Sequence, residues 1–267
     1  MVAPISDLHS RGHALKHCRT RYWFGQLRTL AVLIVWPIDS ALADEPVPEL
    51  SIEQLEPGLF LHRSYKQVEG WGLVGSNGLV VVDDAKALII DTPWSAADTE
   101  QLIDWIEQQD LAVLGSISTH WHEDRTAGIA TLNDKTVPTH VYTMTNQRLQ
   151  QKQLPLASDA FSTPVFTLAE GLAEAYYPGP GHTPDNIVVW LPKSKTLFGG
   201  CLVRSVESKG LGYTGDAVVD QWSQSIQNIL ARYPHSERVV PGHGKVGGSE
   251  LLNHTFQLSE AANGPDS

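Results

Sequence analysis

The feature that most restricts what this chain can fold into is the apolar stretch AVLGSIS (residues 112–118), which leads directly into THWHEDR. A short apolar run of this kind is typical of a buried strand. His120, His122 and Asp124 therefore stand at the carboxyl end of a strand, where open α/β folds build their sites. Side chains two apart in extended backbone point to the same side, so His120 and His122 can bind one metal ion while Asp124 begins to turn away.

Regular elements are expected on both sides of this motif. Apolar and β-branched runs predict an antiparallel meander in the first half, interrupted by a turn at GSNG (75–78). SAADTEQLIDWIEQQ (95–109) predicts a helix that opens with a Ser95-x-x-Asp98 cap. The predicted strands of the first half are residues 59–65, 70–76, 79–84 and 87–92. Those of the second half are residues 173–179, 187–192, 196–203 and 238–244, with helices over 218–233 and 249–262. Two similar α/β halves are implied, each with residues available at strand ends.

Three further residues are candidate metal ligands because each follows or ends a predicted strand. His182 lies in GPGHTPDN, Cys201 in FGGCLV and His243 in VPGHG, and neighbouring glycines let backbone and ion approach closely. A lone histidine or cysteine in such a turn is more often a packing residue. Together with the motif after residue 118, however, the set has the residue types that bind zinc.

The first 43 residues predict a secretory signal peptide. Five basic residues precede the apolar run 29–38, and Ala41 and Ala43 then form an A-x-A pattern, so cleavage is expected after Ala43. The alternative is a membrane anchor, but the run is far shorter than the ~20 apolar residues that span a bilayer. Residues 44–267 are then expected to form one mature domain, exported to the periplasm as a monomer without a membrane partner.

Cleavage would also change the charge and the cysteine content. It removes five of the 19 basic and two of the 30 acidic residues, which leaves a formal net charge of −14. Such a surface repels nucleic acid and anionic membranes, so a small-molecule partner is expected. Cys201 becomes the single cysteine, so no intramolecular disulfide can form. Ligation of a metal explains why a free thiol would be kept in an oxidising compartment.

Taken in order, HWHEDR, PGPGHTPDNIVVWLP, LFGGC and VVPGHG resemble the class B, zinc-dependent metallo-β-lactamases of subclass B1. The similarity runs from about residue 51 to about residue 260, and the combined motifs are highly specific. The resemblance implies an α/β fold, an αββα sandwich with the metal site at the edge between two similar halves. It also implies hydrolysis of the lactam ring of penicillins, cephalosporins and carbapenems by a zinc-bound hydroxide, an activity that confers antibiotic resistance.

The resemblance further implies two zinc ions per chain. The ligands would fall into two sets, His120, His122 and His182 for the first ion and Asp124, Cys201 and His243 for the second. Zinc lowers the pKa of bound water to about 7, so a shared water can supply the nucleophile, and Asp124 would orient it.

Several positions depart from the family pattern or lie beside the expected site. Arg204 stands where many members have a lysine and is expected to meet the substrate carboxylate. Tyr213, in GLGYTGD, replaces a common asparagine and makes a side-chain contact to the oxyanion doubtful, although it stays a predicted substrate-binding residue. Tyr65 and Trp71, in SYKQVEGWG (64–72), are expected on a mobile apolar flap over the substrate; the alternative is a plain hairpin with a buried tryptophan.

Arg125 is expected to hold the ligands of the second zinc by pairing with carboxylates, and the alternative is a solvated surface arginine. Arg125 also bears on a rival function. Thioesterases and lactonases of the same fold carry a histidine directly after the aspartate and lack a cysteine ligand. A second rival is a non-catalytic periplasmic zinc-binding or redox-sensing protein. A structural zinc is usually closed by four protein ligands, whereas two sets of three leave positions for water and substrate.

Overall fold

The computed structural model describes residues 46–264, and the predicted signal peptide, residues 1–43, lies outside them. The strands form a seven-stranded sheet in the order β1 to β7 and a five-stranded sheet in the order β12-β11-β10-β9-β8. The first sheet consists of β1 (Ser51–Glu56), β2 (Leu59–Val68), β3 (Gly72–Asp83), β4 (Lys86–Ile90), β5 (Ala112–Ser118), β6 (Thr139–Tyr142) and β7 (Asp159–Phe161). The second consists of β8 (Val165–Leu168), β9 (Ala173–Tyr176), β10 (Val188–Leu191), β11 (Thr196–Gly200) and β12 (Arg238–Pro241). The helices are α1 (Ala96–Gln108), α2 (Glu123–Thr126), α3 (Ile129–Asp134), α4 (Thr143–Gln151), α5 (Val219–Arg232) and α6 (Glu250–Ala262), with a 3-10 turn η1 (Ala169–Gly171).

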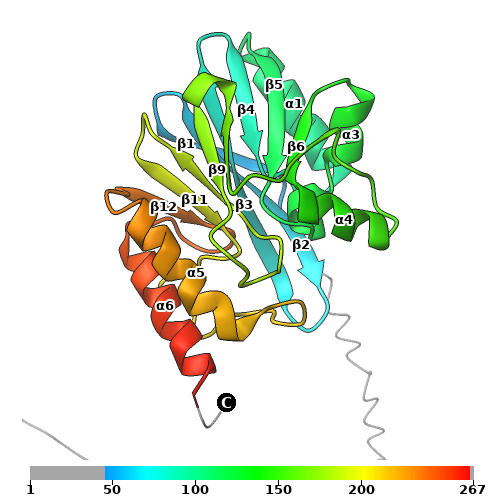
Figure 1. Cartoon of the computed structure of the whole chain (residues 1–267). Helices are drawn as coiled ribbons and strands as arrows, with labels where there is room; N and C mark the ends of the chain where they lie inside the picture. Colours follow the sequence, from blue (N-terminus) through cyan, green and yellow to red (C-terminus); the bar gives the residue numbers. More distant parts are fainter. Residues whose placement is uncertain (1–45, 265–267) are drawn as a thin grey trace, which may run out of the picture. The chain divides into compact units, whose positions relative to one another are not determined.

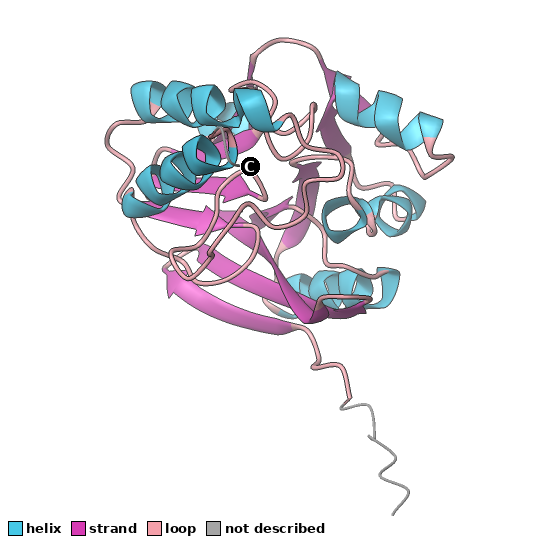
Figure 2. Ribbon diagram, turned by 90° about the horizontal axis from the view of Figure 1, so that it is seen from below, coloured by secondary structure: helices cyan, strands magenta, loops and turns pink. Residues whose placement is uncertain are grey.

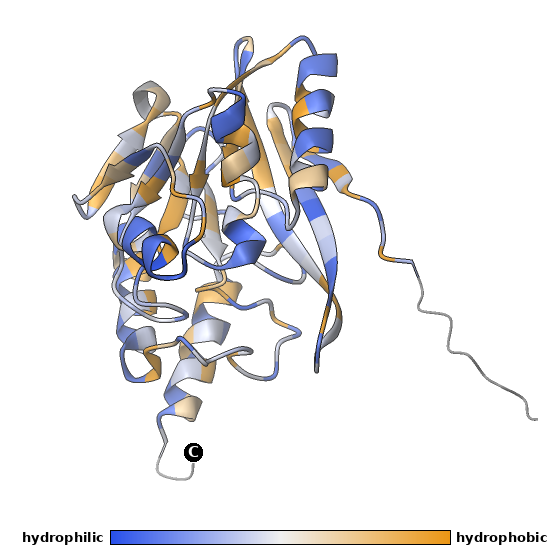
Figure 3. Ribbon diagram, turned by 90° about the vertical axis from the view of Figure 1, so that its right-hand side faces the viewer, coloured by the Kyte–Doolittle hydropathy of each residue, from blue (hydrophilic) through white to orange (hydrophobic). Residues whose placement is uncertain are grey.

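Alternation along the strands produces four layers. In β3, Leu79 and Val81 belong to the core between the two sheets, whereas Val80 belongs to the cluster under α1 and α3. On the other side, Trp222 of α5 and Leu251 of α6 pack against the second sheet. Figure 2 shows the helices in two groups with the strands between them, and Figure 3 shows hydrophilic bands on the helices. The predicted αββα sandwich is confirmed. Within residues 46–264, no helix is long and apolar enough to cross a membrane.

Parallel pairing brings strand ends to the same edge. β1 to β4 pair antiparallel, as the meander predicted, but β5 pairs parallel with β4 and with β6. In the second sheet β11 and β12 are parallel to each other. The segments that follow β5, β11 and β12 therefore leave the sheets at their carboxyl ends. Gly200 ends β11 with φ +52°, a conformation that favours glycine, so Cys201 stands outside the strand that was predicted to continue to residue 203.

The predicted turn at residues 75–78 is wrong, because β3 runs through it without a break. A Cβ on Gly78 would collide with the imidazole of His62, so the glycine permits close packing. Asn77 donates from Nδ2 to the carbonyls of Pro241 and Gly244, both at 2.9 Å. Gly78 therefore permits close packing within the first sheet, and Asn77 binds the second sheet, instead of forming a turn. The predicted cap of α1 is confirmed, since Ser95 Oγ accepts from the Asp98 N–H at 3.0 Å.

Candidate metal centre

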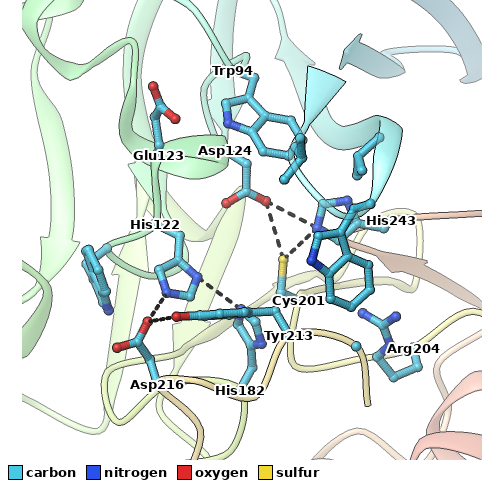
Figure 4. A pocket seen from close by; sticks show the side chains of 15 residues that line it. Trp94, His122, Glu123, Asp124, His182, Cys201, Arg204, Tyr213, Asp216 and His243 are labelled. Carbon is cyan, nitrogen blue, oxygen red and sulfur yellow. Dashed lines mark hydrogen bonds and ion pairs between the residues drawn. The ribbon is translucent and has the colours of Figure 1, made fainter. Parts of the chain in front are cut away.

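The six predicted ligands gather at one edge of the sandwich, in the segments that follow β5, β9, β11 and β12. Figure 4 shows five of them, His122, Asp124, His182, Cys201 and His243. His120 and His122 lie in the bends between β5 and α2, and Asp124 lies in the first turn of α2. The backbone is no longer extended at Asp124, because α2 begins at Glu123, but a carboxylate oxygen of Asp124 still lies within 4.8 Å of ligand nitrogens of both histidines. The structure thus brings together every residue that the motifs predicted as a ligand.

Three imidazole nitrogens converge in this cluster. His122 Nδ1 lies 3.1 Å from His120 Nε2 and 3.1 Å from His182 Nε2. Zinc–nitrogen bonds of 2.0–2.1 Å in tetrahedral geometry place two ligand nitrogens about 3.3 Å apart. Burial lowers the pKa of both His120 and His182 well below the ordinary value, so both are neutral. The one nitrogen of His122 cannot satisfy both neighbours by a conventional hydrogen bond, and the arrangement fits a cation bound between them.

A second set of donors combines a carboxylate, a thiol and an imidazole. Cys201 Sγ lies 3.5 Å from Asp124 Oδ2 and 3.3 Å from His243 Nε2. His243 Nδ1 faces the carbonyl of Gly75 at 2.8 Å, and donating to it leaves Nε2 turned toward the other two donors. Burial acts to lower the pKa of His243, but the Cys201 sulfur and Asp124 raise it to about 10. This set therefore attracts positive charge, and its chemistry fits zinc.

The two sets are parts of one continuous cluster. Among the described residues, three groups of three donors have all their ligand atoms within 4.8 Å of one another. These groups are His120–His182–Cys201, His120–His122–Asp124 and Asp124–Cys201–His243. The third group is the predicted second set. The other two both contain His120, and each combines residues from the two predicted sets. The assignment of the donors to two separate ions stays a prediction.

Arg125 lies beneath the second set and is fully buried, so the alternative of a solvated arginine is wrong. Its guanidinium pairs with Asp124 at 2.7 Å and with Asp91 at 3.2 Å, and Nη2 donates to Cys201 Sγ at 3.1 Å. Burial acts to raise the pKa of Asp124, but Arg125 and His243 hold it well below its ordinary value. Arg125 thus holds the pKa of one candidate ligand, Asp124, low and donates a hydrogen bond to another, Cys201.

Two carboxylates that the sequence did not single out position the histidine segment. Asp91 accepts from the Thr119 N–H at 2.6 Å and from its hydroxyl at 2.9 Å. Asp185 accepts from the Trp121 N–H at 3.0 Å and from the Thr145 hydroxyl at 2.7 Å. Asp185 is part of the GHTPDN motif, and Asp91 follows the apolar run that ends in Ile90. Their contacts with Thr119 and Trp121 join segments far apart in the chain, so no local pattern indicated them. They anchor the backbone on both sides of His120.

Five of the six candidate ligands, all but the fully buried His120, line a pocket of about 460 Å³. Val68, Trp71 and Val74 of the β2–β3 hairpin line one part of it, and Arg204 and Tyr213 line another. Its other lining residues are Trp94, Trp121, His122, Glu123, Asp124, His182, Cys201, Gly212, Asp216 and His243. Motif reading missed Trp94 and Asp216, which are single residues without a spacing pattern. A small molecule in this pocket would contact an apolar hairpin on one side and the ligand cluster on the other.

The structure of the β2–β3 hairpin excludes the alternative to the flap and corrects the position of Tyr65. Trp71 lies at the tip with 57 % of its surface exposed, so the alternative of a buried tryptophan is wrong. Tyr65 does not line the pocket of the ligands but a neighbouring one, together with Lys66 and Leu149. β2 continues to Val68, so Tyr65 belongs to the strand and not to the tip. Motion of the hairpin over a substrate stays a prediction.

Arg204 lines the pocket, and its predicted contact with a substrate carboxylate stays a prediction. Its charge is not neutralised by an ion pair within residues 46–264. Its buried Nε has no hydrogen-bond partner in that part of the chain. Burial lowers the pKa of Arg204, so an anion in the pocket would compensate a desolvated cation. Tyr213 is half exposed and donates its hydroxyl to Asp216 Oδ2 at 3.2 Å.

Comparison with known proteins agrees with this geometry. The family described as the Metallo-beta-lactamase superfamily matches residues 71–243. A "Metallo-beta-lactamase type 2" of Pseudomonas aeruginosa is 41% identical over 215 residues, which cover 80% of this chain and 86% of the relative. The crystal structure of DIM-1 metallo-beta-lactamase exposed to ceftazidime is 56% identical with a TM-score of 0.81 and covers 82% of this chain and 100% of that one. FIM-1 of Pseudomonas aeruginosa, solved in a mono-zinc form, is 32% identical with a TM-score of 0.79 and covers 84% of this chain and 100% of that one. The chain therefore belongs to the metallo-beta-lactamase superfamily, and its motifs place it with the type 2 enzymes of subclass B1.

Proposed function

We propose that this protein is a zinc-dependent β-lactamase that opens the lactam ring of penicillins, cephalosporins and carbapenems. The observation that carries the proposal is the six-donor cluster beside an open pocket, which five of the donors, all but the buried His120, line directly. The names of the relatives at 41% and 56% identity support the same reaction. Cys201 and Arg125 distinguish the chain from thioesterases and lactonases of the same fold.

Different residues of the chain would hold the metal, orient the attacking water and bind the substrate. Zinc held by the six donors would supply Lewis acidity and lower the pKa of a water molecule. Asp124, kept ionised by Arg125, is placed to accept a hydrogen bond from that water and orient it toward the lactam carbonyl. Arg204 binds the carboxylate of the substrate, and Trp71 and Val68 exclude water from the opposite face.

The number of ions is also a proposal. Two zinc ions per chain are supported by a donor set rich in neutral imidazoles beside a set with a carboxylate and a thiol. We further propose that residues 1–43 direct export to the periplasm and that the mature enzyme is a monomer. N-terminal sequencing of periplasmic protein that starts elsewhere than Asp44 would contradict this processing.

Removal of zinc should abolish hydrolysis. The mature protein, assayed with a chromogenic cephalosporin and a carbapenem, is expected to lose nearly all its rate in a strong chelator and to regain it when zinc is added back. Each zinc supplies several kcal/mol of transition-state stabilisation, which corresponds to roughly 100-fold or more in rate. No turnover of either substrate by zinc-loaded protein would refute the proposed function.

Replacement of Arg204 by alanine should raise the KM of carboxylate-bearing β-lactams by about 10- to 100-fold, the effect of one lost charge-assisted hydrogen bond. The maximal rate should change little, because the contact lies away from the reacting bond. Arg204→Lys keeps the charge and is the matched control. An ester analogue without the carboxylate should be hydrolysed alike by all three proteins. An unchanged KM in Arg204→Ala would assign carboxylate binding to another residue.

A further inference from the structure

A carboxylate outside the predicted ligand sets contacts one of the histidines. Asp216 Oδ2 lies 3.0 Å from His122 Nε2, and the same oxygen accepts the Tyr213 hydroxyl at 3.2 Å (Figure 4). The rings of Tyr213 and His122 have centroids 5.8 Å apart in an edge-on arrangement. His122 therefore lies between two partners, with the histidine cluster on its Nδ1 side and Asp216 on its Nε2 side.

This contact fits a His122 that binds a metal through Nδ1. A carboxylate oxygen accepts hydrogen bonds, so the ring nitrogen that faces it donates its N–H. With Nε2 directed at Asp216, Nδ1 is the nitrogen turned toward His120 and His182. A metal-ligating histidine commonly donates its other N–H to a carboxylate, which fixes the ring and makes the ligating nitrogen more basic.

Tyr213 holds the carboxylate in turn. The Tyr213 hydroxyl donates to the same oxygen, Asp216 Oδ2, that faces His122. The segment is shaped for this contact, because Gly212 has φ +75° and a Cβ on Gly215 would collide with the Tyr213 hydroxyl. Residues 204–218, all of them described, contain no helix or strand, so no ladder of backbone hydrogen bonds fixes Asp216. The Val218 N–H, which donates to the carbonyl of Gly181 at 2.8 Å, ties the segment to the one that carries His182.

We propose that Asp216 and Tyr213 are positioning residues for the metal held by His120, His122 and His182. Asp216 fixes the tautomer and ring orientation of His122, and the Tyr213 hydroxyl fixes Asp216. Tyr213 also lines the pocket, so Asp216 Oδ2 links a pocket-lining side chain to a histidine of this metal site. This inference rests on the proposed zinc site.

The test measures the affinity of zinc by competition with a chromophoric chelator, independently of hydrolysis. Asp216→Ala is expected to weaken the binding of one zinc by about 10- to 100-fold. Asp216→Asn keeps an oxygen acceptor of the same size and should recover part of that loss. Tyr213→Phe keeps the ring and should weaken the same zinc by about fivefold. The double variant Tyr213→Phe/Asp216→Ala should bind zinc no more weakly than Asp216→Ala alone.

Tyr233→Phe is the matched control. Its hydroxyl donates to Glu174 Oε1 at 2.7 Å, the same kind of bond outside the pocket, and its loss should leave zinc affinity unchanged. Nitrogen-15 spectra of labelled histidines report the tautomer. In Asp216→Ala, the signal of the His122 Nε2–H should disappear or its hydrogen should exchange faster with solvent. If the wild-type protein binds no zinc, the proposed function fails. If it binds zinc and Asp216→Ala binds equally well, this inference alone fails, and an additive loss in the double variant removes Tyr213 from it.

Discussion

Replacing Cys201 with serine should lower the zinc content from the proposed two ions per chain toward one and slow β-lactam hydrolysis by about 100-fold or more. Cys201 is 1 % exposed, and its sulfur lies 3.5 Å from Asp124 Oδ2 and 3.3 Å from His243 Nε2, so it is central to the second set of donors. A thiol loses its proton when it binds zinc, whereas a serine hydroxyl keeps its proton near neutral pH and is a poor ligand. Ligation by the remaining Asp124 and His243 leaves the second ion weakly held.

Metal analysis after dialysis against metal-free buffer measures the stoichiometry, and a chromogenic cephalosporin reports the rate. Cys201→Asp is the informative companion, because it restores an anionic ligand and should recover part of the second ion. Thiol labelling adds a direct readout, since the wild-type sulfur should react faster once zinc has been removed. A serine variant that keeps two zinc ions per chain would show that Cys201 is a buried packing residue.

The parts of the fold that the sequence predicted are those with a local signal. The apolar run before THWHEDR is β5, and the Ser95-x-x-Asp98 pattern does begin α1. The αββα layers followed from family resemblance, and the alternation of Leu79, Val80 and Val81 between two cores agrees with them. The candidate ligands could be named because each follows a strand whose carboxyl end lies at the same edge. The spacing of the six residues along the chain, however, does not show which donors bind which ion, because all six form one continuous cluster.

Contacts between distant segments account for what the sequence did not show. Gly78 and Asn77 read as turn residues, although they lie in β3 because His62 and the β12 segment require a small residue and an amide there. α3, α4, β6 and β7 are short and lack a strong period, so no pattern predicted them. Asp216 is a single carboxylate in a glycine-rich segment, and its importance depends on His122, 94 positions away.

Replacing Arg125 with methionine should lower the free energy of unfolding of the zinc-free protein by about 3–5 kcal/mol, because it leaves two buried carboxylates without their cation. The guanidinium is fully buried and pairs with Asp124 and Asp91. Zinc should restore part of the lost stability, since an ion at Asp124 replaces the missing charge there but not at Asp91. Denaturant unfolding with and without zinc measures both quantities. Arg232→Met removes the partly exposed pair with Glu174 and should cost at most about 1 kcal/mol.

The pH dependence of the same variant tests whether charge compensation or packing explains the loss. Burial raises the pKa of Asp91 to about 7 even though Arg125 lowers it, so removal of Arg125 should raise it further. A carboxyl whose pKa is higher in the folded than in the unfolded state binds its proton on folding, so stability falls as pH rises from the unfolded value to the folded one. Above pH 7 the wild-type contribution of Asp91 levels off, whereas the variant continues to lose up to about 1.4 kcal/mol per pH unit. The difference between the two proteins should therefore widen from pH 6 to pH 8, and a difference independent of pH would assign the loss to the missing side-chain volume instead.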